Sequence, residues 1–278
     1  MKSKTLCETF FQTPALWLLF LLPAVLPAQP LTAPVRSLGV GGAGVALVGE
    51  TSGLLNPAAL GESALRQVSF SAAQGFGMAE LRHGLLTVSL PMNALSLGLN
   101  VGSFGFEAFR ETQFRLHAAR GFGFGSKRKF YLGATAQYHM LNISNYGNGS
   151  AFSVGIGGLT ALTDRTMIGF RISNLNKATY TNGEELPRNL AVGLAYKPLP
   201  DVRFLLDAEK DVRFPVSVRG GFEYSPVKSL TLRSGFSTAP VRYAAGVGFK
   251  AGRLGADAAF ERHETLGWTP SVAFSVGF

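Results

Sequence analysis

Apolar and polar residues alternate one by one along most of the second half of the sequence, which is the pattern of a β-strand with two unlike faces. The segment VRFLLDAEK places Val202, Phe204 and Leu206 on one face. Its other face carries Arg203 and Asp207. The segments VSVRGGFEY, VRYAAGVGFK and LGADAAF continue the pattern, so we expect a succession of strands that each have an apolar face and a polar or small one.

The alternation predicts fourteen strands, an even number as single-chain bacterial barrels have. The predicted strands are 68–74, 82–90, 94–102, 112–121, 129–141, 149–161, 166–174, 188–197, 202–210, 215–224, 228–236, 241–250, 252–261 and 269–278. The pieces after even-numbered strands are mostly tight turns such as PMN, LTDRT and PLPD, with FGFGSKRK a longer exception. The pieces after odd-numbered strands are generally longer, the longest being 175–187. This asymmetry is typical of outer-membrane barrels and predicts an N-terminus in the periplasm.

The N-terminal residues have the pattern of an export signal. Lys2 and Lys4 precede the apolar run ALWLLFLLPAVL, and Ala28 is the expected cleavage point. The apolar run is interrupted by proline and is too short to span a bilayer comfortably. The only cysteine, Cys7, precedes that run, so we expect residues 1–28 to be removed and the mature chain to contain neither cysteine nor disulfide.

The C-terminal residues, TPSVAFSVGF, alternate up to an aromatic last residue. The segment resembles the terminal strand by which outer-membrane barrels are recognised for assembly. Its apolar positions are Val272, Phe274, Val276 and Phe278. We therefore expect the barrel assembly machinery and outer-membrane lipid to be partners of the chain.

Composition and alternation together predict an all-β fold, a transmembrane antiparallel β-barrel in the outer membrane of a Gram-negative bacterium. Hydrophobic residues make up 46% of the chain and the mean hydropathy is +0.19. Alternation lets such a chain cross a membrane with strands of about 9–11 residues. The alternative is a soluble β-sandwich, whose apolar faces would meet a second sheet.

The charged residues are spread over many strands. Without residues 1–28 the chain keeps 24 basic and 16 acidic side chains, a net charge of +8. Because the basic residues are not clustered with aromatic ones, no nucleic-acid partner is expected. The polar side chains predicted to face the lumen are Arg115, His117, Gln137, His139, Arg171, Asp207, Arg219, Glu223, Arg233, Arg242 and Asp257. We expect ion pairs that brace the wall, with a polar track for a solute as the alternative.

The candidate catalytic chemistry is sparse. His117 and His139 share the inward parity, which leaves a Ser/His pair of a membrane-embedded hydrolase as an alternative. No pattern fixes a nucleophile, a base and an orienting group together, and no spacing of His, Asp or Glu is typical of a metal site. We therefore expect no enzymatic activity, no metal and no cofactor.

A glycine-rich stretch follows the signal, and its first six residues, GVGGAG from Gly39 to Gly44, match the dinucleotide-binding pattern G-x-G-x-x-G. That pattern requires an apolar strand immediately before it. The preceding residues, PLTAPVRSL, contain two prolines and an arginine and cannot form such a strand. A nucleotide site is therefore not expected.

The longer stretch LGVGGAGVALVGETSGLLNPAALG resembles the N-terminal segment of the FadL-like superfamily of outer-membrane barrels. The matching motif residues are Gly39, Gly41, Gly42, Ala43, Asn56, Pro57 and Ala58. The resemblance implies that residues 29–66 form a hatch that enters a barrel formed by residues 67–278. Glycine and alanine would then permit close packing inside a crowded lumen.

Further segments, among them RISNLNK, LPRNLAVGLAYKP and AAGVGFKAGRLGADAAFE, resemble the PorV/PorQ branch, which is associated with type IX secretion. This resemblance implies a non-enzymatic scaffold or cargo-shuttling component, with other type IX secretion proteins and secreted cargo as partners. The loop 175–187 is the first candidate contact. The alternative is a FadL-like channel for hydrophobic or small solutes, in which the hatch moves and the inward arginines guide an anion.

Overall fold

The structure is a computed structural model that describes residues 33–49, 52–63, 66–92, 94–124 and 128–278. The predicted signal peptide with Cys7, and the first residues of the predicted hatch, lie outside the described residues.

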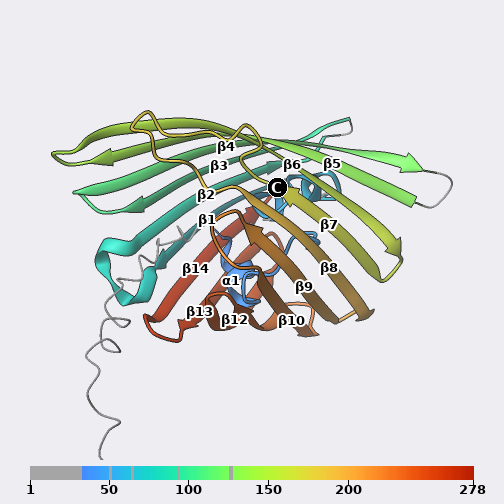
Figure 1. Cartoon of the computed structure of the whole chain (residues 1–278). Coiled ribbons are helices and arrows are strands. Elements are labelled where there is room, and N and C mark those ends of the chain that lie inside the picture. The colour runs from blue at the N-terminus through green and yellow to red at the C-terminus, as the bar shows by residue number, and fades with distance from the viewer. Residues whose placement is uncertain (1–32, 50–51, 64–65, 93, 125–127) are drawn as a thin grey trace, which may run out of the picture. The chain divides into compact units, whose positions relative to one another are not determined.

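Fourteen antiparallel strands close into one barrel (Figure 1). The strands are β1 (Gln67–Gln74), β2 (Arg82–Leu90), β3 (Ser96–Gly105), β4 (Phe109–Phe124), β5 (Arg128–Ile143), β6 (Gly147–Thr163), β7 (Thr166–Ile172), β8 (Asn189–Leu199), β9 (Val202–Asp211), β10 (Ser217–Val227), β11 (Leu230–Thr238), β12 (Val241–Ala251), β13 (Leu254–His263) and β14 (Gly267–Gly277). Each strand pairs with its neighbours in sequence, and β1 closes the ring by pairing with β14. Closure leaves no sheet edge, as a hydrocarbon environment requires.

All fourteen predicted strands are confirmed, and their bounds differ from the prediction by at most three residues. The segment FGFGSKRK was predicted to connect β4 and β5, but its residues 122–124 and 128–129 belong to these strands, and residues 125–127 lie outside the described residues. The register pairs Phe122 with Phe130 and continues to Phe124 and Arg128. The prediction was wrong because glycine and lysine suggested a loop, whereas the phenylalanines on both strands continue the sheet.

The outward face of the barrel is apolar. Exposed large apolar side chains include Phe70, Leu99, Leu116, Phe152, Leu206, Phe260 and Phe274. The predicted assembly-signal residues Val272, Phe274, Val276 and Phe278 all lie on this face, near the end of the chain, with 46–64% of their surface exposed. An apolar surface that continues around a barrel indicates a lipid-facing belt.

No helix in the described ranges is long and apolar enough to cross a membrane.

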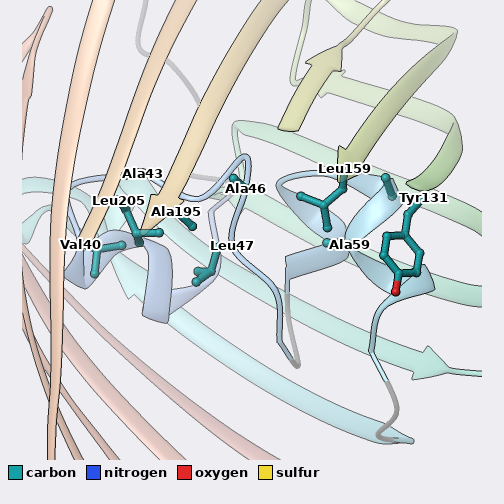
Figure 2. Packing of buried hydrophobic residues seen from close by; sticks show 10 residues of the cluster. Val40, Ala43, Ala46, Leu47, Ala59, Tyr131, Leu159, Ala195 and Leu205 are labelled. Carbon is teal, nitrogen blue, oxygen red and sulfur yellow. The ribbon is translucent and has the colours of Figure 1, made fainter. Parts of the chain in front are cut away.

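The N-terminal segment, defined as the described residues 33–49 and 52–63, lies against the inner side of the barrel wall (Figure 1). It contains the helix α1 (Val35–Gly39) and the 3-10 turns η3 (Ser52–Leu54) and η4 (Pro57–Gly61). Val35 and Leu38 of α1 pack against Ala259 of β13, and most of the other apolar side chains of the segment are buried with inward-facing wall residues in a larger cluster (Figure 2). The cluster contains Val40, Ala43, Ala46, Leu47, Ala58, Ala59, Tyr131, Leu159, Ala195 and Leu205.

The strand β7 is much shorter than β6, with seven residues against seventeen. A loop, residues 173–188, takes the place of the missing part of β7 along β6. The backbone N–H of Leu175 donates to the carbonyl of Val154 over 2.9 Å, and that of Thr181 donates to Ser150 over 3.1 Å. The wall of the barrel is therefore completed at this point by irregular chain.

Because the outward face is a lipid-facing belt, a charged substitution on it is expected to cost more stability at the middle of a strand than near its end. Leu206→Lys, at the centre of β9, is expected to lower the free energy of unfolding by about 2–4 kcal/mol. Leu199→Lys, at the end of β8, is expected to cost less than about 1 kcal/mol, because lysine reaches water near the rim. Reversible denaturation in lipid vesicles measures both values, and equal losses would contradict the assignment of the belt.

Candidate functional site

The N-terminal segment rests on a track of glycines in the barrel wall. The track consists of the inward-facing residues Gly133, Gly157, Gly169, Gly193, Gly221, Gly235 and Gly246. Three pairs of them, Gly133 with Gly157, Gly169 with Gly193 and Gly221 with Gly235, are partners in the strand register. A Cβ at any of these positions would meet the segment or the carboxylate that holds it at 3.1 Å or less. The segment can therefore pack this closely against the wall because the glycines of the track have no side chains.

The glycines of the segment are needed for the same contact. Gly41 and Gly42 have φ of +71° and +82°, a region that residues with a Cβ rarely adopt. A Cβ at Gly41 would overlap the backbone of Phe236 on β11. Gly41, one of the predicted motif residues, therefore lies where the segment closely approaches β11.

A cluster of charges connects α1 to the wall. The Glu223 carboxylate on β10 accepts from Nε and Nη2 of Arg36 over 2.8 and 2.7 Å. It also accepts from Arg203 over 2.8 Å and from Arg233 over 3.0 Å. Arg233 donates in addition to Asp257 over 2.5 Å. Because Glu223 is only 4% exposed, these bonds form in a medium that weakens charge interactions less than water does.

A second carboxylate, Asp207 on β9, holds the glycine-rich turn. Its Oδ2 accepts from the backbone N–H of Gly44 over 2.6 Å and from that of Val45 over 2.9 Å. In a dinucleotide site such N–H groups at the end of the glycine motif bind phosphate. Here an internal carboxylate binds them, so these two donors serve to hold the segment.

Asn56 fixes the following turn. Its Oδ1 accepts from the N–H of Ala58 and caps η4, which begins with Pro57. Its Nδ2 donates to the carbonyl of Val45 over 2.7 Å and to that of Gly158 in the wall over 3.1 Å. Asn56 is fully buried, so each of these bonds replaces one that water would otherwise supply.

Two further arginines bridge wall and segment. Arg171 on β7 donates to the carbonyl of Leu55 over 2.9 Å and pairs with Glu209 over 3.1 Å. Arg219 on β10 pairs with the same carboxylate over 3.0 Å and reaches the carbonyl of Gly42 over 3.5 Å. Glu209 thus holds both guanidinium groups in place against the segment.

Other predicted lumen residues form a separate network on β2 to β5. Nδ2 of Asn100 donates to Thr87 over 2.9 Å, so its Oδ1 faces Nε2 of His117 at 2.5 Å as an acceptor. Nδ1 of His117 then accepts from Thr135 over 2.8 Å. These partners fit a neutral imidazole with its proton on Nε2.

The network continues toward the loop 173–188. Glu111 accepts from Gln113 over 2.6 Å and from the Tyr180 hydroxyl over 3.1 Å, and its carboxylate lies 3.4 Å from Nδ1 of His139. Burial and the nearby Glu111 carboxylate raise the pKa of Tyr180 above its usual value. The hydroxyl therefore stays protonated and acts as a donor that fastens the loop to the wall.

Ser153, His139 and Glu111 follow one another in the order of a hydrolase triad, with 3.5 Å between Ser153 Oγ and His139 Nε2. However, when the Gln137 amide oxygen faces these groups, it accepts from His139 Nε2 over 2.9 Å and from Arg115 Nε over 2.9 Å. A nitrogen that donates to Gln137 cannot take a proton from Ser153. The arrangement therefore serves hydrogen bonding within the wall.

The predicted site residues thus divide into groups. Asp207, Arg171, Arg219, Glu223 and Arg233 lie at the N-terminal segment, and Asp257 joins them through Arg233. The predicted residues Arg115, His117, Gln137 and His139 lie in the separate network, and Arg242 pairs with Glu261 over 3.1 Å. No group of three or more His, Cys, Asp or Glu within the described ranges could hold a metal ion.

Sequence analysis missed Arg36, Tyr180 and the glycine track, and it placed Arg203 on a polar strand face without naming it as a site residue. Arg36 and its partner Glu223 are 187 positions apart, and no local pattern connects them. The track, by contrast, has a signal: glycines recur on the inward parity of seven strands, as in VGIGG, MIGF and VRGGF.

No protein-family model matches the sequence, and no curated protein sequence matches it. Solved structures are similar over most of the chain. The chain is similar to the TodX deltaS2S3 mutant monoaromatic hydrocarbon channel, with a TM-score of 0.66 and 12% identity over 88% of this chain and 99% of that one. It is also similar to the toluene transporter TbuX of Ralstonia pickettii, with a TM-score of 0.61 and 14% identity over 90% of this chain and 99% of that one. A FadL homologue of Pseudomonas aeruginosa gives a TM-score of 0.54 and 12% identity over 90% of this chain and 99% of that one.

The fold is FadL-like. The likeness concerns the fold alone, and it agrees with the barrel architecture that the resemblance of the N-terminal glycine-rich stretch implies. The comparisons give no support to the narrower PorV/PorQ resemblance.

Because the charge cluster of this FadL-like barrel holds α1 against the wall, removing its central carboxylate is expected to release the N-terminal segment more often. Glu223→Gln is expected to weaken the hold on Arg36 by about 2 kcal/mol, a charged hydrogen bond being worth about 1.5–3 kcal/mol. The fraction of time that the segment is released then rises at least tenfold. The rate of trypsin cleavage after Arg36, followed by mass spectrometry of the detergent-solubilised protein, measures this release.

The matched control is Glu261→Gln, which removes a buried carboxylate that pairs with Arg242 of the wall. It is expected to destabilise the barrel and leave cleavage after Arg36 unchanged. Equal cleavage of both variants would show that Glu223 does not hold the segment.

The glycine track of the FadL-like barrel predicts a second way to release the segment. Gly235→Ala puts a methyl group into the backbone of Val40 and Gly41, so the segment must move away from β11. Gly84→Ala on β2 is the control, because a Cβ there meets nothing within 4 Å. The first variant is expected to speed cleavage after Arg36 at least tenfold and the second to leave it unchanged. Cleavage of Gly235→Ala at the wild-type rate would refute the role of the track.

Proposed function

We propose that the protein is a FadL-like channel of the outer membrane that admits small solutes, and that the N-terminal segment is the hatch that closes it. One observation carries the proposal: the segment lies inside a complete barrel and contributes no strand to it. It is held by side-chain contacts, such as those of Glu223 and Asp207, and by packing. Its displacement would free the lumen without breaking any strand pairing.

The comparisons support the class of function. The similar structures are described as a hydrocarbon channel, a toluene transporter and a FadL homologue, which favours a channel over a component of type IX secretion. The apolar belt supports placement in a membrane, and the export signal supports the outer membrane of a Gram-negative bacterium.

The polar inner wall favours small polar or amphipathic molecules as the solutes of the proposed channel. Inward positions on β1 to β3 carry Ser69, Ser71, Thr87, Ser89 and Asn100, all buried. Further along the wall the inward positions carry the ion pairs described above. A solute that exchanges hydrogen bonds with such a wall gives up less solvation than it would in an apolar pore.

A disulfide between segment and wall tests the proposal. A Cβ at Gly39 would lie 3.5 Å from the Cβ of Arg233, within the range of a disulfide. The double variant Gly39→Cys/Arg233→Cys, reconstituted without the signal peptide, has no other cysteine. Swelling of liposomes in small sugars and amino acids measures permeation. The reduced form is expected to be at least tenfold more permeable than the oxidised form.

The single variants Gly39→Cys and Arg233→Cys are the controls, and their permeability is expected not to respond to oxidation. Equal permeation through the oxidised and reduced double variant would refute the role of the hatch. Absence of permeation in the wild type and in every reduced variant would refute the channel.

A further inference from the structure

A cavity of about 310 Å³ lies at the end of the barrel where the short turns connect the strands. The turns from β8 to β9 and from β10 to β11 contribute Asp201, Lys228 and Ser229 to its lining. The N-terminal segment contributes Arg36 and Val48. The cavity is thus bounded by both the wall and the segment, and its size is at the lower end of the range for small-molecule sites.

The lining is strongly cationic. Its basic side chains are Arg36, Lys197, Arg203, Lys228, Arg233 and Lys250, and its acidic side chains are Asp201, Glu223 and Asp257. The lining therefore has a net charge of +3. A cationic concavity with walls of low dielectric constant concentrates anions.

The acidic side chains of the lining form no ion pair with Lys197 or Lys228. Glu223 accepts only from arginines, and Asp257 accepts from Arg233. Within the described ranges, Lys197 and Lys228 form no ion pair with an acidic side chain. Two exposed ammonium groups of the same cavity are thus available to a ligand.

The remaining polar groups are hydroxyls. Ser225, Ser229 and Thr231 line the cavity, and the Ser225 and Thr231 hydroxyl oxygens lie 3.0 Å apart. Lysine, arginine and hydroxyl groups together are the donors that bind phosphate oxygens. A single carboxylate would offset one of the three excess charges, whereas a phosphate monoester, with a charge of about −2 at neutral pH, offsets two.

We propose that this cavity is a binding site for a phosphate-bearing anion. The anion is either a small soluble phosphate ester or the headgroup of an anionic phospholipid, which share this chemistry. The site goes beyond the proposed channel, because binding is measured without transport. Failure of the channel test therefore leaves this proposal standing, and the reverse also holds.

Calorimetric titration of the detergent-solubilised protein at low salt tests the site with inorganic phosphate and glycerol 3-phosphate as probes. Native mass spectrometry with phosphatidylglycerol tests the lipid headgroup. The variant Lys197→Gln/Lys228→Gln is expected to weaken binding of the effective probe at least tenfold. The control Lys129→Gln/Arg165→Gln removes two cations at the same end of the barrel that do not line the cavity, and it is expected to change binding less than twofold.

The outcomes distinguish a soluble phosphate ester from a phospholipid headgroup. Binding of a soluble probe that only the cavity variant loses supports a site for a free phosphate ester. Binding of phosphatidylglycerol alone, lost in the same variant, supports a headgroup site. Equal weakening in both double variants would show that a diffuse positive field binds the anion and would overturn the proposal. Absence of binding by all three probes would also overturn it.

Discussion

The requirement that every backbone N–H and C=O inside a membrane be paired governs this structure. Fourteen strands meet it by closing on themselves, with β1 paired to β14. Closure creates an inner surface as well as an outer one, and each strand must serve two environments. The outer surface is apolar because lipid surrounds it, whereas the inner surface carries hydrogen-bonding groups that must find partners within the barrel.

Many of those partners belong to the N-terminal segment of the chain. Carboxylates such as Glu223 and Asp207 bind arginine and backbone N–H groups of the N-terminal segment, and the glycine track brings the segment close enough for such bonds to form. Shape and charge therefore depend on each other here. A side chain larger than glycine on the track would separate donor from acceptor, and a carboxylate without its donors would be a buried charge left unpaired.

The sequence was most informative where structure is local. Alternation revealed the strands because adjacent residues of one strand face different surroundings. It predicted that Asp207 and Glu223 face the lumen, and in the structure both carboxylates contact the N-terminal segment. It could not reveal the partner of Glu223, since Arg36 is far away in sequence and lies in a helix of five residues. The glycine track was overlooked because a glycine fits either face of an alternating strand. The segment FGFGSKRK misled for a related reason, because its composition suits a turn while its described residues, 122–124 and 128–129, continue the ladder of β4 and β5.

The short strand β7 gives the barrel wall a region of lower local stability. Along most of the ring, opening one seam requires breaking a ladder of regular backbone bonds, as between β4 and β5. Along residues 147–155 of β6, which β7 does not reach, the loop 173–188 supplies only a few backbone bonds, supplemented by the side chain of Asn176. We therefore expect the free energy of local opening to be lower there than along β4 and β5, and amide hydrogens of β6 near Val154 to exchange with solvent sooner than those that face β5. Local opening of the wall is therefore expected mainly where β6 meets the loop 173–188, while the other strands remain paired.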